Sequence, residues 1–149
     1  MSISFQIASL EAMTLAFTFD SDEAAAIGKI DRFATAIGVP AARRFQVELA
    51  ITQRGVRNVT YIRYAAVPKG TGNEKDINII DLPAGEFVRF TATKEEYTAF
   101  ADGAMRTTLD EFMKTNNLGY DMSKVFALAE PIVADGVTHY DIIMPVKRK

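Results

Sequence analysis

The sequence predicts an α+β fold in which two similar modules form a curved antiparallel sheet with two helices. Three observations support this prediction. Each half of the chain shows the order strand, helix, strand, strand. The expected helices carry apolar residues at steps of three and four, whereas several of the expected strands alternate apolar and polar residues. The 149 residues are 48% hydrophobic, and this length suits a single domain.

The first module is expected over residues 1–70 and begins with a β-rich stretch followed by a helix. Residues 3–19 favour β structure, with a break at 9–12. Residues 20–23 (Asp-Ser-Asp-Glu) offer hydroxyl and carboxylate groups to the free N–H groups of a starting helix. The helix is predicted to begin near residue 22 and to end at Gly38, where the one-sided apolar pattern stops.

A β-hairpin is expected to complete the first module. Residues 45–52 alternate between apolar and polar side chains, which indicates a strand with one wet face. Residues 54–57 contain a glycine and form a plausible tight turn into a second strand at 58–67. Residues 68–73, with one proline and two glycines, are interpreted as an exposed linker.

The second module, residues 74–149, is expected to repeat this order. Residues 76–92 are β-rich with a break at 82–85, and residues 94–116 are predicted to form one amphipathic helix. Two final strands are expected on either side of the Asp135-Gly136 pair, at 125–133 and 137–146, because Asp-Gly is a strong hairpin signal.

The duplication itself predicts where a ligand would bind. One helix on a three-stranded unit leaves a sheet face and strand edges exposed, so a single module would be marginally stable. Pairing the two modules about a pseudo-two-fold axis removes this problem. The seam between two related halves is a natural place for a concave pocket, and the function is expected there.

Composition and charge exclude several classes of protein. The chain has 17 basic and 19 acidic residues, a net charge of −2, so neither direct nucleic-acid binding nor membrane binding is expected. Its arginines at 43, 44, 54, 57 and 63 are interpreted as solvated hairpin charges. There is no cysteine and a single histidine, His139, so no disulfide, multi-histidine metal site or cofactor is predicted. The apolar run at 12–19 is too short to span a bilayer, and a cytoplasmic location is expected.

Four motifs follow one another as they do in a known family. Residues 82–88 (Leu-Pro-Ala-Gly-Glu-Phe-Val) are similar to a strand start of the GyrI-like family, and residues 9–13 resemble its opening motif. Residues 111–121 resemble the family's helix end and following turn, and residues 140–147 resemble its last strand. This family includes gyrase-inhibitory proteins and the effector-binding domains of drug-sensing bacterial transcription activators.

The resemblance implies a GyrI-like fold, a pair of strand-helix-strand-strand modules, with a role in small-molecule binding, multidrug sensing or transcription regulation. The two modules are expected to use the whole sequence and to leave no residues for a helix-turn-helix. The protein is therefore expected either to regulate transcription through a separate protein partner or simply to sequester its ligand. Family members that bind cationic drugs usually carry a glutamate after the aromatic residue of the penultimate strand. Here Ala127 follows Phe126. Glu130 is expected to share a strand face with Phe126 and to supply the pocket carboxylate from this different position.

The candidate ligand-binding residues are aromatic side chains and two strand carboxylates. Aromatic rings provide flat apolar walls, and a carboxylate facing a cavity of low dielectric constant binds a cation or acts as a base. The predicted site consists of Glu48, Tyr61, Tyr64, Tyr97, Phe100, Phe126, Glu130 and Tyr140. For each residue taken alone, core packing or a solvated strand face is the alternative interpretation.

Three functions fit these residues. The leading hypothesis is binding of a hydrophobic small molecule, either neutral or cationic. The resemblance also allows a small hydrolase of reactive natural products, in which a pocket carboxylate activates water. The third is a protein-interaction module, as gyrase inhibition in the family implies. No nucleophile or oxyanion group can be named, so binding without catalysis is favoured, and no catalytic residue is predicted.

Overall fold

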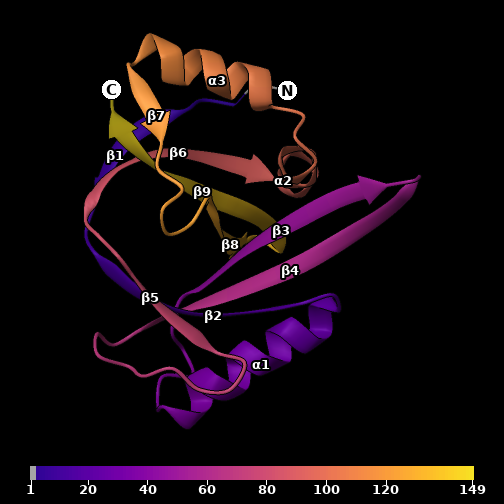
Figure 1. Cartoon of the computed structure of the whole chain (residues 1–149), viewed down its shortest axis with the longest axis vertical. Coiled ribbons are helices and arrows are strands. Elements are labelled where there is room, and N and C mark those ends of the chain that lie inside the picture. Colours follow the sequence, from indigo (N-terminus) through magenta and orange to yellow (C-terminus); the bar gives the residue numbers. More distant parts are fainter. Residues whose placement is uncertain (1–2) are drawn as a thin grey trace. The chain divides into compact units, whose positions relative to one another are not determined.

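The computed structural model describes residues 3–149, which form two compact units (Figure 1). Unit 1 contains the N-terminal segment up to Glu11 and residues 84–149, whereas unit 2 is Ala12–Pro83. The described residues form nine strands and three helices, and every strand pairing within the units is antiparallel. The α+β class predicted from the sequence is confirmed.

Unit 2 consists of four strands and one helix. The helix, α1 (Glu23–Ala36), connects the first and second strands of the unit. The strands pair in the order β3-β4-β2-β5, where β2 is Met13–Asp20, β3 is Arg44–Gln53, β4 is Val56–Val67 and β5 is Asn78–Leu82.

The start of α1 follows from the acidic residues that precede it. The Asp22 side chain accepts a hydrogen bond from the backbone N–H of Ala25, so it satisfies one of the free donors of the first turn. Ile30 and Phe33 of α1 are buried against Ala65 and Val67 of β4. The predicted start of this helix is therefore confirmed, and these contacts show which face of the unit 2 sheet faces α1.

Unit 1 has the same order of strands with additional elements. Its main strands pair in the order β1-β6-β9-β8, where β1 is Gln6–Leu10, β6 is Gly85–Thr93, β8 is Leu128–Ala134 and β9 is Val137–Arg148. A short strand, β7 (Leu118–Tyr120), pairs with the end of β9. The helices are α2 (Lys94–Ala101) and α3 (Arg106–Thr115), and they pack on one face of β6 and β9.

The single helix predicted at 94–116 is wrong, because the chain breaks it between α2 and α3. Gly103 has a φ of +88°, a left-handed conformation that other residues adopt only at a cost. Its N–H donates to the carbonyl of Phe100, and the next N–H donates to that of Ala99, which ends α2. The apolar periodicity continues across this break, so the pattern alone did not reveal it.

The duplicated architecture is present in both units, but the units do not coincide with the two chain halves at 1–70 and 74–149. The order β3-β4-β2-β5 corresponds to β8-β9-β6-β1, and both hairpins turn on two residues of positive φ, Arg54-Gly55 and Asp135-Gly136. However, β1 pairs with β6 in unit 1, and β5 pairs with β2 in unit 2. Thus β1, from the first half of the chain, completes the sheet of unit 1, which the second half mainly forms. In the same way β5, from the second half, completes the sheet of unit 2.

Within residues 3–149, no helix has the length and the apolar composition needed to cross a membrane.

Candidate functional site

Glu48 and Tyr61 lie on the face of the unit 2 sheet that packs against α1. The two residues are directly opposite in the β3–β4 register. Tyr61 is two and four residues before Arg63 and Ala65, and strand residues two apart point to the same side. Because Ala65 contacts the core under α1, all of these side chains belong to the α1 face.

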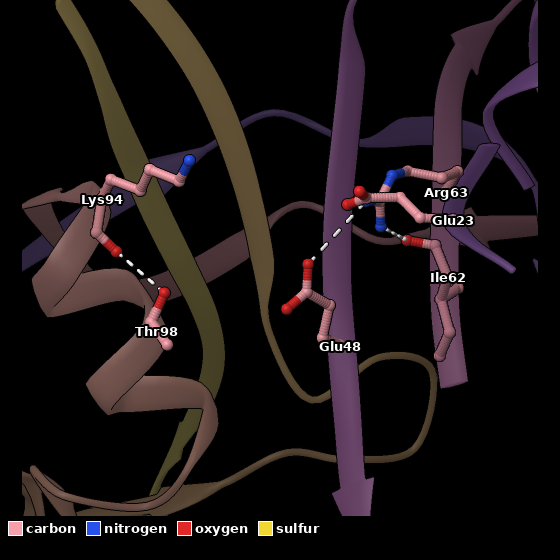
Figure 2. Close-up of polar contacts among 6 residues, drawn as sticks. All are labelled: Glu23, Glu48, Ile62, Arg63, Lys94 and Thr98. Atoms are coloured by element: carbon pink, nitrogen blue, oxygen red, sulfur yellow. Dashed lines mark hydrogen bonds and ion pairs between the residues drawn. The ribbon is translucent and has the colours of Figure 1, made fainter. Parts of the chain in front are cut away.

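Arg63 on this face is buried and connects two acidic side chains (Figure 2). Its Nη2 donates to Glu23 Oε2 at 2.6 Å and lies 3.8 Å from Glu48 Oε1, while its Nη1 donates to the Ile62 carbonyl at 3.1 Å. The guanidinium carbon is 5.7 Å from the centre of the Tyr61 ring. These partners offset the desolvation of the charge. Glu23, Glu48 and Arg63 are called the arginine cluster below.

The arginine cluster is specific to unit 2. Arg63 is the eighth residue of β4, and the eighth residue of β9 after the equivalent hairpin turn is Met144, which is fully buried. The topology therefore does not require a charge at this position. The sequence interpretation of Arg63 as a solvated hairpin charge is wrong, since only 5% of the residue is exposed. The even spacing of Tyr61, Arg63 and Ala65 is the sequence signal that could have indicated its inward direction.

Tyr64 lies on the opposite face of the same sheet. It is three residues from Tyr61, it is 6% exposed, and its cross-strand partners are Phe17 and Phe45. The ring centres of Tyr64 and Phe17 are 5.7 Å apart. The structure therefore brings Tyr61 together with Glu48 but does not bring it together with Tyr64.

Burial raises the pKa of Tyr64 to about 12. The unfolded chain loses this proton near the ordinary value of 10.0, so folding is favoured below pH 10 and this contribution is lost as the pH rises toward 12. We predict that the free energy of unfolding falls steeply over this interval and falls less in Tyr64→Phe. Urea unfolding at several alkaline pH values measures this difference. Equal slopes for the two proteins would show that Tyr64 ionises as freely in the folded state as in the unfolded state.

Two of the predicted aromatic residues of unit 1 form part of its core. The rings of Tyr97 in α2 and Tyr140 in β9 stack with 4.4 Å between their centres and 18° between their planes. They are 5% and 9% exposed and belong to the core cluster under the helices. This geometry agrees with the alternative interpretation, core packing, for both residues.

The other predicted aromatic residues of unit 1 reach the surface. The ring of Phe100 in α2 contacts core residue Phe90 on one side, with ring centres 5.4 Å apart. On the other side it is nearly parallel to Phe126, at 6.4 Å and 6°, and the ring of Tyr120 is 6.0 Å from Phe126. Phe126 is 40% exposed. Phe100, Tyr120 and Phe126 are called the aromatic patch below.

Tyr120 was not among the predicted site residues. Its hydroxyl donates to Asp110 Oδ1, and burial together with this carboxylate raises the pKa of Tyr120. The phenol therefore stays neutral at physiological pH. Asp110 also lies 3.9 Å from the exposed guanidinium of Arg106, so the charges beside the patch form an ion pair. The resemblance noted for residues 111–121 includes this tyrosine, but only the tertiary structure shows that its ring lies close to Phe126.

Glu130 does not share a face with Phe126, contrary to the expectation from strand alternation. The strand β8 begins only at Leu128, and Phe126 precedes it and stacks on a residue of α2. Glu130 is opposite Asp141 in the register, on the face away from the helices. There Asp141 forms a bidentate pair with Arg89, at 3.0 and 2.7 Å.

Unit 2 also contains an open pocket that none of the predicted site residues lines. It has a volume of about 530 Å³ and lies where β2 begins and where β4 and β5 end. This strand-end pocket is lined by Ala12, Met13, Thr14, Ala66, Val67, Lys69, Asp81, Leu82 and Pro83. The breaks at 9–12 and 82–85 and the linker at 68–73 mark these strand ends in the sequence.

No metal site is found in the part of the chain that the structure describes, since no three His, Asp or Glu side chains there are grouped to hold an ion.

Comparison with solved structures shows the same fold in other proteins. The C-terminal domain of EcmrR matches 100% of this chain and 100% of its own length, with 14% identity and a TM-score of 0.62. A hydrolase from Listeria innocua matches 96% of this chain over 91% of its own, with 10% identity and a TM-score of 0.66. EcmrR in a complex with DNA matches 99% of this chain over 58% of its own, with 12% identity and a TM-score of 0.61.

No protein-family model matches the sequence, and a search of curated proteins finds no significant match. Identities this low establish the fold alone. The GyrI-like fold that the sequence resemblance implied is confirmed.

Proposed function

We propose that the protein binds a hydrophobic small molecule, neutral or cationic, and that the aromatic patch forms part of the binding surface. The supporting observation is that Phe126 remains 40% exposed although its ring lies parallel to Phe100 and close to Tyr120. Adjacent aromatic rings at a surface offer a ligand a large apolar contact area at fixed geometry. The faces of these rings also attract a cation, whereas the Asp110 carboxylate beside Tyr120 is paired with the guanidinium of Arg106 at 3.9 Å.

The fold supports this proposal. EcmrR, whose C-terminal domain shares the fold, also occurs in a complex with DNA, and the resembled family includes effector-binding domains of transcription activators. Unrelated functions occur on the same fold, so the site itself must support the assignment. Drug sensing and transcription regulation through a separate partner are the biological context that we propose for this binding. Glu48, Tyr61 and Glu130 remain candidate ligand-binding residues.

Replacing Phe126 with alanine tests the proposal. We predict that Phe126→Ala weakens binding of a fluorescent lipophilic cation about tenfold, since one aromatic contact contributes about 1 kcal/mol beyond the apolar area it covers. Fluorescence titration of the dye measures the affinity. Phe19→Ala is the matched control, because Phe19 belongs to unit 2 and is 57% exposed. Equal affinities of wild type and Phe126→Ala would refute a role of the aromatic patch.

The hydrolase alternative is retained because a Listeria innocua protein named a hydrolase has this fold with a TM-score of 0.66. In that case a carboxylate, Glu48 or Glu130, would activate water. The test measures ester turnover and dye affinity together in Glu48→Gln and Glu130→Gln. Turnover by the wild type that disappears in either variant while dye affinity persists would establish the hydrolase and overturn binding without catalysis.

A further inference from the structure

The strand-end pocket of unit 2 has the size and the lining of a small-molecule site. Its volume of about 530 Å³ lies within the range of about 300 to 1,000 Å³ that is usual for such sites. Apolar groups supply most of its wall, among them Met13, Val67, Leu82 and Pro83. Three polar side chains complete it: Thr14, Lys69 and Asp81.

Of the two charged side chains in the pocket wall, one is fixed by a hydrogen bond and the other is not. Asp81 Oδ1 accepts a hydrogen bond of 2.7 Å from the hydroxyl of Thr14, whose residue is 9% exposed. This bond orients the carboxylate from a nearly buried anchor. Among residues 3–149, Lys69 forms no hydrogen bond or ion pair, and Asp81 forms no ion pair. The ammonium and the carboxylate therefore line one pocket without neutralising each other at close range.

We propose that the strand-end pocket binds a small apolar zwitterion, a molecule that carries an ammonium group and a carboxylate beside a hydrophobic side chain. Such a ligand places its ammonium near Asp81, its carboxylate near Lys69 and its side chain against the apolar wall. A ligand with a single charge matches one of these groups and brings a like charge toward the other. Hydrophobic amino acids have the required chemistry.

Three compounds of similar shape separate the contributions of the two charges. L-phenylalanine carries both charges, phenethylamine carries only the ammonium, and phenylpropanoate carries only the carboxylate. Because both wall charges are solvent-accessible, each matched charge is expected to contribute about threefold in affinity. Isothermal titration at pH 7 is expected to rank phenylalanine first, about threefold tighter than either analogue.

Single substitutions assign each charge to its partner. Lys69→Met is expected to weaken phenylalanine about threefold and to leave phenethylamine unchanged or tighter. Asp81→Asn keeps an acceptor for Thr14, and it is expected to weaken phenylalanine and phenethylamine but not phenylpropanoate. Each variant thus retains a ligand that reports an intact pocket. Lys75→Met is the control, since Lys75 is an exposed lysine of unit 2 outside the pocket.

The proposal is overturned if none of the three compounds binds, if all three bind equally to the wild type, or if both variants lose all three ligands together. The aromatic patch provides an independent check. Phe126→Ala is expected to leave the affinity for phenylalanine unchanged, because Phe126 does not line the strand-end pocket. Failure of the zwitterion site and failure of the proposed function therefore give different results.

Discussion

Replacing Arg63 with alanine is expected to destabilise the protein by about 3 kcal/mol, the cost of removing one partner from a buried ion pair. The guanidinium is almost fully buried and donates to Glu23 and to the Ile62 carbonyl. Its loss leaves Glu48, whose side chain is 19% exposed, without this cation. It also removes an aliphatic stem from a side chain that is only 7% exposed. Because the Glu23 side chain is 52% exposed and can be hydrated, the expected value lies at the low end for a buried pair.

Two control substitutions isolate the effect of burial. Arg148 forms a bidentate pair with Glu86 at 2.8 and 2.9 Å, but its side chain is 57% exposed, so Arg148→Ala is expected to cost much less than Arg63→Ala. Arg63→Met keeps much of the side-chain volume and copies Met144 of unit 1, so it is expected to cost less than Arg63→Ala. Urea unfolding followed by circular dichroism measures all three. Equal losses for Arg63→Ala and Arg148→Ala would contradict the importance of burial.

Replacing Phe5 with alanine is expected to destabilise unit 1 by about 2 kcal/mol, which is less than for a fully buried ring because Phe5 is only partly buried. The ring of Phe5 contacts Phe90 of β6 at 5.1 Å and Phe112 of α3 at 5.5 Å, measured between ring centres. Both partners are more than 80 residues away in the sequence. The N-terminal segment therefore stabilises the unit that the C-terminal half builds.

The part of the protein that loses stability in Phe5→Ala shows whether residues 3–11 are stabilised with unit 1 or with the first half of the chain. In Phe5→Ala, amide hydrogen exchange is expected to accelerate in β6, β9 and α3, whereas β2 and β4 keep their protection. If residues 1–70 behaved as one stability unit, the loss would instead concentrate in β2 and β4. Phe19→Ala is again the control, since this ring of unit 2 is exposed and its removal costs little buried apolar area.

The local elements of this fold could be predicted from the sequence because they depend on nearby residues. Asp22 before an apolar face of period 3.6 determines the start of α1, and Asp135-Gly136 determines the second hairpin through its left-handed backbone. Repetition of the same element order was enough to predict duplicated modules and the α+β class. The break at Gly103 was missed because the apolar pattern runs through it and hides a backbone conformation that only φ reveals.

Only the tertiary structure decided which residues share a surface. Strand pairing over long distances places β1 in unit 1 and β5 in unit 2, and no local pattern encodes that exchange. The separation of Tyr61 from Tyr64 is by contrast local, because residues three apart in a strand point to opposite faces. Spacing also places Arg63 on the same face as Ala65, but only the packing of α1 on that face buries its charge. The aromatic patch and the strand-end pocket arise in the same way, because each gathers side chains from segments that are distant in the sequence.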